Sequence, residues 1–329
     1  MNITVVGAGG WGTALACLLV RNGHRVKLWS WQEDHTAQMR REKENRTFLP
    51  GVPLPEELEL TSDMAAVSGA ELVLFAVPSA VMSGVAETAA PLIPASALVV
   101  NAAKGLVPGS YRRMSEVLRE LLPHNPVCVL SGPSHAEEVG RRLPTAVCVA
   151  GSDKEACRRV QDAFMDRCFR VYTNPDLIGV EIGGAIKNIV ALASGVCDGL
   201  GLGDNTRAAL MTRGLAEMKR LGLALGAKAE TFAGLTGMGD LIVTCTSLHS
   251  RNYRTGREIG RGRKWREVLA ETEMVVEGVC ATDCAYALCR KLGVEMPITQ
   301  QMYSILYEDR DPSEAMWQLM TRPRTDEIG

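Results

Sequence analysis

Residues 3–13 read ITVVGAGGWGT, a short apolar run that leads directly into spaced glycines. The pattern G-x-G-x-x-G between a β-rich run and a helical stretch predicts a dinucleotide-binding turn. We expect Gly7 to make the tight turn, Gly9 to let the backbone approach a pyrophosphate, and Gly12 to pack the helix closely on the strand. The free N–H groups and partial positive charge of that helix N-terminus would then face the phosphates.

Working outward from this turn, β-rich apolar runs alternate with helical stretches through the first half of the chain. The expected strands are 3–7, 25–30, 71–77, 97–102, 126–132, 145–151 and a short one at 169–173. The expected helices between them include 13–22, 81–90, 111–122 and 153–165. This alternation predicts βαβ units and an α/β, Rossmann-type, doubly wound and mainly parallel sheet.

Beyond residue 176 strand-like runs become scarce and helical stretches follow one another. The expected helices are 179–198, 206–226, 229–236, 266–271, 277–292 and 297–307. The Asn174-Pro175 turn signal places the boundary near 173–178. We therefore predict an NAD(P)-binding domain over 1–176 and an all-α substrate-binding domain over 177–329.

Composition excludes several classes of protein. The 329 residues carry a formal net charge of −2, which gives no electrostatic reason to bind nucleic acid or a membrane. No apolar run approaches the roughly 18 residues of a membrane span, and the N-terminus MNITVVGAGG lacks the features of a signal peptide. Ten cysteines without any C-x-x-C spacing indicate free thiols in a cytoplasmic protein and no metal site.

A lysine in an unusual setting marks the candidate catalytic region. Residues 183–193 read GGAIKNIVALA, so Lys187 and Asn188 interrupt a small, apolar helical stretch. An ionised lysine is costly to bury, and such a residue is either reaching the surface or in use. The stretches NAAKGL (101–106) and SGPSHA (131–136) end two predicted strands at the edge where open α/β sheets place ligands.

The helical half supplies two further stretches of polar character. Gly-Met-Gly-Asp at 237–240 is interpreted as a tight loop that leads Asp240 into an apolar run. Ser250-Arg251-Asn252 opens a basic stretch, and an arginine beside a hydroxyl and an amide suits a phosphate, which guanidinium binds bidentately. The later arginines are interpreted as a solvated helix face.

The choice between NAD and NADP is open in the sequence. An NAD site commonly has an acid at the end of the second strand, but Ser30 and Trp31 stand there and Glu33 and Asp34 follow. No arginine is present to attract a 2′-phosphate either. The missing acid gives a slight preference for NADP, and Trp31 either stacks near the adenine or covers the sheet edge.

The whole chain resembles the bacterial, soluble NAD(P)-dependent glycerol-3-phosphate dehydrogenases. The motifs are GAGGWGTALA (7–16), AAKGL (102–106), SGPSHAEEV (131–139), EIGGAIKNIVALASG (181–195), LTGMGDLIVTC (235–245), SRNYRTG (250–256) and VVEGV (275–279). The resemblance implies reversible hydride transfer between NAD(P)H and dihydroxyacetone phosphate. The product, sn-glycerol 3-phosphate, feeds glycerophospholipid synthesis, and members of this family commonly form homodimers.

The resemblance also implies roles for individual residues. Lys187 would be the general acid–base, Lys104 would polarise the reacting carbonyl, and Asp240 would orient the ammonium and hold the substrate hydroxyl. Implied substrate contacts are Lys104, Gly132, Ser134, Lys187, Asn188, Asp240, Thr244, Ser250, Arg251 and Asn252, with Gly132 and Ser134 on the nicotinamide side. Implied cofactor contacts are Gly7, Gly9, Gly10, Trp11, Gly12, Trp31, Lys104, Ala136, Arg251, Val275 and Glu277.

Two other functions fit parts of the pattern. A β-hydroxyacid or 6-phosphogluconate-type dehydrogenase would also place an asparagine close after a helix-borne lysine, but the Gly-Met-Gly-Asp and Ser-Arg-Asn stretches favour a small phosphate monoester. A non-catalytic NAD(P)H-binding regulator could share the fold, although Lys104, Lys187 and Asp240 are all present. Such a regulator would bind cofactor without turnover.

Overall fold

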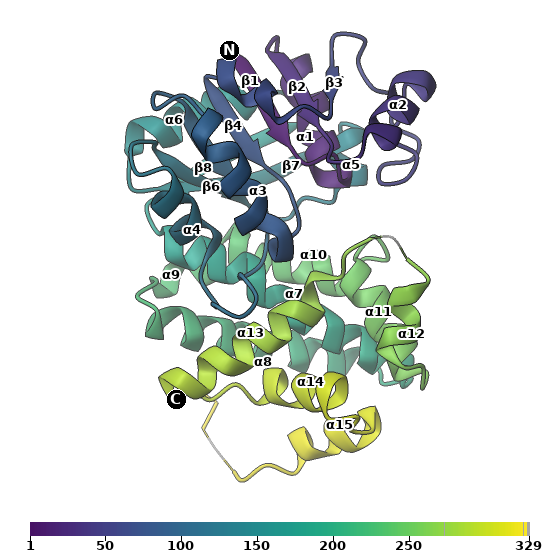
Figure 1. The fold of residues 1–329 in the computed structure, drawn as a ribbon. Coiled ribbons are helices and arrows are strands. Elements are labelled where there is room, and N and C mark those ends of the chain that lie inside the picture. Colours follow the sequence, from purple (N-terminus) through teal and green to yellow (C-terminus); the bar gives the residue numbers. More distant parts are fainter. Residues whose placement is uncertain (273, 325, 328–329) are drawn as a thin grey trace.

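The computed structural model describes residues 1–272, 274–324 and 326–327, and it contains two halves of different construction. The eight strands among these residues lie between Asn2 and Asn174, and the regular elements described from Leu177 onward are all helices. Figure 1 shows the sheet half above the helical half, with α7 (Leu177–Gly199) and α10 (Asp240–Thr246) along the boundary between them. The predicted α/β sheet followed by an all-helical region is confirmed.

The sheet has the strand order β3-β2-β1-β4-β5-β6-β7-β8. Its strands are β1 (Asn2–Val6), β2 (Arg25–Trp29), β3 (Glu59–Thr61), β4 (Leu72–Phe75), β5 (Leu98–Asn101), β6 (Val127–Ser131), β7 (Thr145–Gly151) and β8 (Phe169–Asn174). Neighbouring strands are parallel except β6 and β7, which are antiparallel. The strand β3 was not expected, because three residues at a sheet edge leave almost no apolar signal.

Alternate residues of each strand point to opposite faces of the sheet, and helices cover both faces, so the sheet is buried on both sides. In β4, Leu72 and Leu74 belong to the core under α1 (Gly10–Arg21) and α6 (Lys154–Phe164). Val73 and Phe75 belong to the core under α3 (Met82–Ala89) and α4 (Met114–Leu121). Two further α-helices of this half, α2 (Glu33–Glu42) and α5 (Ala136–Gly140), were not expected. Three short 3-10 helices lie between β3 and β5: η1 (Met64–Gly69), η2 (Ser79–Val81) and η3 (Ala90–Leu92).

The helical half is built around α7, which is almost entirely buried. Around it lie α8 (Asp204–Ala224), α9 (Ala229–Phe232), η4 (Leu235–Gly239), α10, α11 (Arg251–Gly260), α12 (Trp265–Ala270), α13 (Glu277–Leu292), α14 (Pro297–Tyr307) and α15 (Pro312–Met320). By length and composition alone α7 could cross a membrane, but 94% of its apolar window is buried inside the protein. The expectation that no apolar run approaches the length of a membrane span was wrong. The mean hydropathy of α7 stays high over 18 residues even though Glu181 and Lys187 interrupt its apolar run.

Glycines allow α7 and α11 to pack backbone against backbone. A Cβ atom on Gly195 would collide with the carbonyl oxygen of Tyr253, and one on Gly199 with that of Arg257. On the facing helix, Cβ atoms on Gly256 and Gly260 would collide with carbonyl oxygens of α7. This close approach brings the N-terminus of α11 against the middle of α7, where Asn188 lies.

The Gly-Met-Gly-Asp stretch is helical, so its interpretation as a tight loop was wrong. Residues Leu235–Gly239 form one turn of π-helix that continues directly into α10, and Asp240 is the first residue of α10. The glycines are there for packing: a Cβ on Gly237 would collide with the carbonyl oxygen of Phe232. The expected helix 229–236 correspondingly ends at Phe232.

Asp176 ties the start of α7 to the neighbouring turn, and its loss should destabilise the protein. Its buried carboxylate accepts hydrogen bonds from the N–H of Gly179 (2.9 Å), the N–H of Lys228 (2.8 Å) and the hydroxyl of Thr231 (2.6 Å). We expect Asp176→Ala to lower the free energy of unfolding by about 2–4 kcal/mol, because it removes a helix cap and leaves buried donors unpaired.

The matched control is Asp311→Ala. Asp311 caps α15 through the N–H groups of Ser313 and Glu314 but is exposed, so water replaces its bonds at a cost of about 1 kcal/mol. Urea unfolding of the three proteins measures the difference. Equal losses for the two variants would show that burial of Asp176 contributes nothing.

Candidate active site

A cleft of about 680 Å³ lies between the two halves at the carboxyl edge of the sheet. The strand order places β2 on one side of β1 and β4 on the other, and ligands of open α/β sheets bind at such a switch point. One wall is formed by the glycine turn and the segments that follow β2, β4, β5 and β6. The opposite wall comes from α7, α10, the start of α11 and the residues just before α13.

The glycine turn has the geometry that a pyrophosphate requires. Gly7 adopts a φ of +120°, which only glycine accepts readily, and a Cβ on Gly12 would collide with the Gly7 carbonyl oxygen. A Cβ on Gly9 would meet no atom within 4 Å, so the backbone there is open to the cleft. The helix α1 begins at Gly10, three residues before the expected start, and directs its first N–H groups to the same place. These residues fit the phosphates of a dinucleotide cofactor.

Three charged side chains meet at the other end of the cleft. The Nζ of Lys187, on α7, lies 2.5 Å from Oδ1 of Asp240 and 2.7 Å from Oγ1 of Thr244. The Nζ of Lys104, after β5, lies 2.9 Å from the second oxygen of the same carboxylate. Asp240 is 1% exposed and Lys187 is 5% exposed, whereas the Lys104 side chain is 16% exposed. The carboxylate therefore pairs with one ammonium group that is withdrawn from bulk water and one that is partly open to it.

Burial and charge shift the proton affinities of this group. Burial lowers the pKa of Lys187 to about 8, a shift that Asp240 opposes and Lys104 reinforces. Burial disfavours ionisation of Asp240, but Lys104 and Lys187 together outweigh it and hold the pKa of that carboxyl below its usual range. A lysine with a pKa near neutrality can both donate and accept a proton, which is the property of a general acid–base.

Lys104 is held in place from the strand β6 side. Its Nζ donates to the Gly132 carbonyl oxygen (2.8 Å) and to the Ser134 hydroxyl (3.3 Å), and Ser134 itself donates to the Gly132 carbonyl oxygen. Gly132 adopts a φ of +141°, and a Cβ there would press on Val147. The segment after β6 therefore aims one ammonium group at the Asp240 carboxylate.

A second network connects α7, α11 and α13 beside the lysines. The Asn188 side chain donates to the carbonyl oxygens of Lys104 (3.2 Å) and Gly184 (3.3 Å), and its oxygen accepts from Asn252 (2.9 Å). The Asn252 oxygen accepts from the N–H of Gly278 (2.8 Å). These contacts leave one lone pair on the Asn188 oxygen and one N–H of the Asn252 amide without a partner among the described residues.

The relationship to known proteins follows the geometry. A family model described as the N-terminus of NAD-dependent glycerol-3-phosphate dehydrogenase matches residues 2–157, and the model of its C-terminus matches residues 176–317. The chain belongs to the NAD-dependent glycerol-3-phosphate dehydrogenase family. The family resemblance seen in the sequence motifs is thereby confirmed.

Individual relatives agree with this family over nearly their full lengths. The chain is 55% identical over 328 residues to the glycerol-3-phosphate dehydrogenase [NAD(P)+] of Moorella thermoacetica, covering 99% of this chain and 98% of that protein. It is 51% identical to the protein of the same name from Geobacillus thermodenitrificans, covering 99% and 96%. A crystal structure of glycerol-3-phosphate dehydrogenase from Coxiella burnetii superposes with a TM-score of 0.95 at 43% identity, covering 98% and 99%.

Most residues that the glycerol-3-phosphate dehydrogenase resemblance singled out line the one cleft. These are Gly7, Gly9, Gly10, Trp11, Trp31, Lys104, Ser134, Ala136, Lys187, Asn188, Asp240, Thr244, Ser250, Arg251, Asn252, Val275 and Glu277. Gly12 lies beneath the turn and Gly132 behind Lys104, so neither forms part of the wall. Trp31 is 75% exposed and lies at the wall of the cleft.

Several residues at or behind the cleft wall were not anticipated. Ser79, which follows β4 and is buried behind the wall, donates its N–H (2.9 Å) and hydroxyl (2.5 Å) to the Glu277 carboxylate. This contact joins the sheet half to the start of α13. Burial raises the pKa of Glu277. His35 and Phe48 line the far end of the cleft, and Phe48 comes from a loop without any recognisable motif. Among the described residues no group of three or more His, Cys, Asp or Glu side chains could hold a metal ion.

Proposed function

We propose that the protein is an NAD(P)-dependent sn-glycerol-3-phosphate dehydrogenase that interconverts dihydroxyacetone phosphate and sn-glycerol 3-phosphate. The observation that carries the proposal is the buried Lys187–Asp240–Lys104 group, which shares one cleft with the glycine turn of a dinucleotide site. The bound nicotinamide would supply the hydride. Family membership, with relatives 50–55% identical over nearly the whole chain, supports the same substrate.

In this proposal the proton is handled by Lys187. Its ammonium would give a proton to the carbonyl oxygen as that oxygen gains electrons, and its amine would take the proton back in the oxidation. Lys104 would polarise the same oxygen, which its position 2.9 Å from the shared carboxylate allows. Asp240 holds both ammonium groups at the cleft, and mutual pairing reduces the cost of burying the charges of Lys187 and Asp240.

The phosphate of the substrate would lie at the N-terminus of α11. Ser250 caps this helix by accepting from the N–H of Tyr253 (3.2 Å), and the first N–H groups point toward the cleft. Arg251 is exposed at the rim, and no described residue accepts a hydrogen bond from its guanidinium. A phosphate would thus meet three kinds of donor: the first N–H groups of α11, the Arg251 guanidinium and the free amide N–H of Asn252. The free lone pair of Asn188 and the hydroxyl of Thr244 would contact the triose.

The experiment that tests the function is oxidation of NADH and NADPH by dihydroxyacetone phosphate, followed by the absorbance of the reduced nicotinamide. We expect turnover with dihydroxyacetone phosphate and none with β-ketoacids or the product of 6-phosphogluconate oxidation. Binding of NADH without any turnover would favour the non-catalytic regulator. Turnover only with a β-hydroxyacid pair or with 6-phosphogluconate would favour the other dehydrogenase class.

Substitution of Arg251 tests the phosphate site. We expect Arg251→Ala to raise the KM for dihydroxyacetone phosphate about 10–100-fold with a smaller change in kcat, because a charged hydrogen bond made equally in ground and transition states is lost. Arg254→Ala, one turn further on and also exposed, should leave KM unchanged. Steady-state kinetics at saturating NADH measure KM and kcat for both variants. An unchanged KM in Arg251→Ala would show that the substrate phosphate does not bind at Arg251.

The two halves of the structure support a division of the chain into two domains. We propose an NAD(P)-binding domain over 1–176 and a substrate-binding domain over 177–329, supported by the last strand ending at Asn174 and α7 beginning at Leu177. We also propose a cytoplasmic homodimer. All ten cysteines are free thiols, which suits a reducing compartment, and sedimentation velocity would measure the oligomeric state.

A further inference from the structure

The far end of the cleft lies where β2 ends and α2 begins. In a Rossmann-type sheet the residue at the end of the second strand contacts the ribose 2′ position of the adenosine. Here the wall at that end is formed by Ser30, Trp31, Gln32, His35 and Phe48. None of these side chains is a carboxylate, a lysine or an arginine, so a hydrogen-bond pattern must distinguish a 2′-hydroxyl from a 2′-phosphate.

The orientation of the Asn45 side-chain amide determines the direction of the first hydrogen bond in that pattern. Its amide nitrogen donates to the Ala8 carbonyl oxygen (2.9 Å), which can only accept. Its side-chain oxygen accepts from the N–H of Phe48 (3.2 Å), which can only donate. Two backbone groups therefore determine which end of the amide faces His35. The oxygen faces it, 3.1 Å from Nε2 of the ring.

The hydrogen bond from His35 to Asn45 also determines the direction of the hydrogen bond between His35 and Ser30. Because Nε2 must donate to the Asn45 oxygen, Nδ1 of the neutral ring is an acceptor. The Ser30 hydroxyl lies 3.1 Å from Nδ1 and must give its hydrogen to it. The ring is held by an edge-on contact with Phe48, with ring centres 5.3 Å apart. Ser30 is 3% exposed and no described residue donates to its oxygen, so only lone pairs remain for a ligand.

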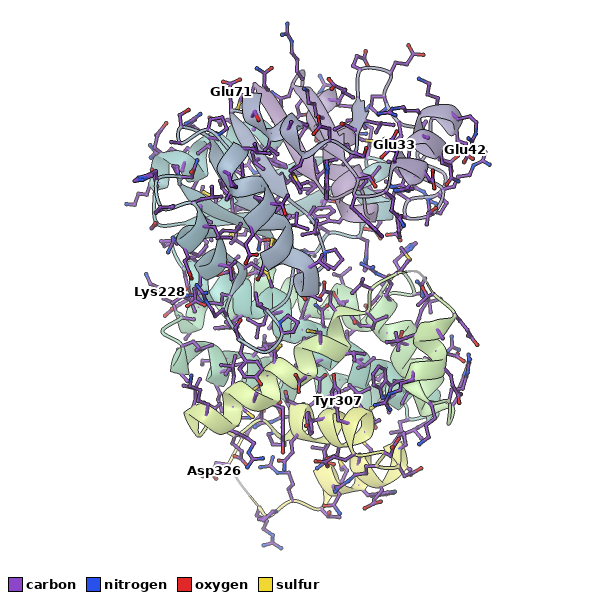
Figure 2. The ribbon with its side chains drawn as sticks, viewed as in Figure 1. Glu33, Glu42, Glu71, Lys228, Tyr307 and Asp326 are labelled. Atoms are coloured by element: carbon purple, nitrogen blue, oxygen red, sulfur yellow. The ribbon has the colours of Figure 1, made fainter. Side chains whose placement is uncertain are left out.

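Nearby charges do not alter this pattern. Arg40 donates to Glu33 (3.1 Å) and to the Leu60 carbonyl oxygen, and Arg46 lies 3.6 and 3.4 Å from the carboxylates of Glu42 and Glu44. Glu33 is also bonded to Ser62. Figure 2 shows Glu33 and Glu42 at the outer side of the sheet half, on α2. These arginines are engaged by neighbours, and none of them lines the cleft.

We propose that the Ser30–His35–Asn45 chain makes this enzyme select NADH over NADPH, with Ser30 accepting a hydrogen bond from the ribose 2′-hydroxyl. The hydroxyl oxygen does here what a carboxylate does at the same place in other NAD sites. A 2′-phosphate brings negative charge and acceptors to a site that offers it neither a donor from Ser30 nor a lysine or arginine from the wall at that end of the cleft. The proposal rests on the proposed dehydrogenase function and reverses the slight preference for NADP that the missing acid suggested.

The test is a comparison of dissociation constants for NADH and NADPH, measured by calorimetry at pH 8 without substrate. We expect the native protein to bind NADH at least about 10-fold more tightly, since a hydrogen bond and a charge both favour it. Ser30→Ala should weaken NADH about 5–10-fold and leave NADPH unchanged. His35→Phe should reduce the preference, because the Ser30 hydroxyl is then free to donate.

His35→Gln provides the matched control. A glutamine amide can donate to Asn45 and accept from Ser30, so the preference for NADH should persist. Equal or tighter binding of NADPH by the native protein would overturn the proposal, as would an equal loss of both cofactors in Ser30→Ala. Thermal unfolding of each variant shows that it is folded. Because binding is measured without dihydroxyacetone phosphate, failure of turnover would count against the dehydrogenase function and not against the Ser30 assignment.

Discussion

Lys187→Ala is expected to lower kcat for the reduction of dihydroxyacetone phosphate by about 10²–10⁴-fold, the contribution of a positioned acid–base group. The reason is geometric. Lys187 is buried on α7, its Nζ lies against Asp240 and Thr244, and its pKa of about 8 lets it exchange a proton near neutral pH. The glycine turn is on the other side of the cleft, so the dissociation constant for NADH should stay within about 2-fold, as for a distant site.

Two companion variants separate proton transfer from charge. Lys187→Arg keeps a cation that does not lose its proton at working pH, so it should be nearly as inactive as Lys187→Ala. Lys219→Ala, an exposed lysine on α8, should keep native kinetics. Stopped-flow reduction with saturating NADH measures the chemical step. Native turnover in Lys187→Ala would show that another group transfers the proton.

The sequence predicted the fold wherever the signal was local. The run ITVVGAGGWGT contains the strand, the turn and the helix start within 11 residues, and the structure has all three. The strands buried on both faces were equally evident, because each is a continuous apolar run. The three-residue β3 and the polar α2 escaped, since neither carries an apolar periodicity of its own.

Glycine was the main source of error in the helical half. Gly237 and Gly239 have low helix propensity and indicated a tight loop, yet both belong to a helical segment. A Cβ on Gly237 would collide with the Phe232 carbonyl oxygen, so tertiary packing outweighs local preference there. The close approaches between α7 and α11 join segments tens of residues apart, so no local sequence pattern indicates them.

In the candidate site, too, local features could be predicted from the sequence and contacts between distant segments could not. Lys187 could be singled out because an apolar helix with one lysine is unusual by itself. The sharing of one carboxylate by Lys104 and Lys187 joins three segments at 104, 187 and 240, and only the resemblance connected these residues. The polarity of the Ser30–His35–Asn45 chain depends on which atoms face the backbone of Ala8 and Phe48. That information exists only in the folded arrangement.

Asp240→Asn is expected to lower kcat by about 10²-fold and to move the pH profile of the reduction. The amide cannot hold two ammonium groups as the carboxylate does at 2.5 and 2.9 Å, and a misplacement of about 1 Å costs a factor of this size. The carboxylate also raises the pKa of Lys187 against the effect of burial, so its neutralisation lowers that pKa further below 8.

The direction of the pH shift distinguishes this role from a purely structural one. Reduction requires the Lys187 ammonium, so kcat/KM for dihydroxyacetone phosphate in the native enzyme should fall as pH rises through about 8. Oxidation requires the amine, so kcat/KM for glycerol 3-phosphate should fall as pH drops through the same value. In Asp240→Asn both limbs should move to lower pH, which leaves oxidation less impaired than reduction at pH 7. If activity falls while both limbs keep their pH values, Asp240 acts only as a structural support. A change in folding or position alone would not alter the pKa of Lys187.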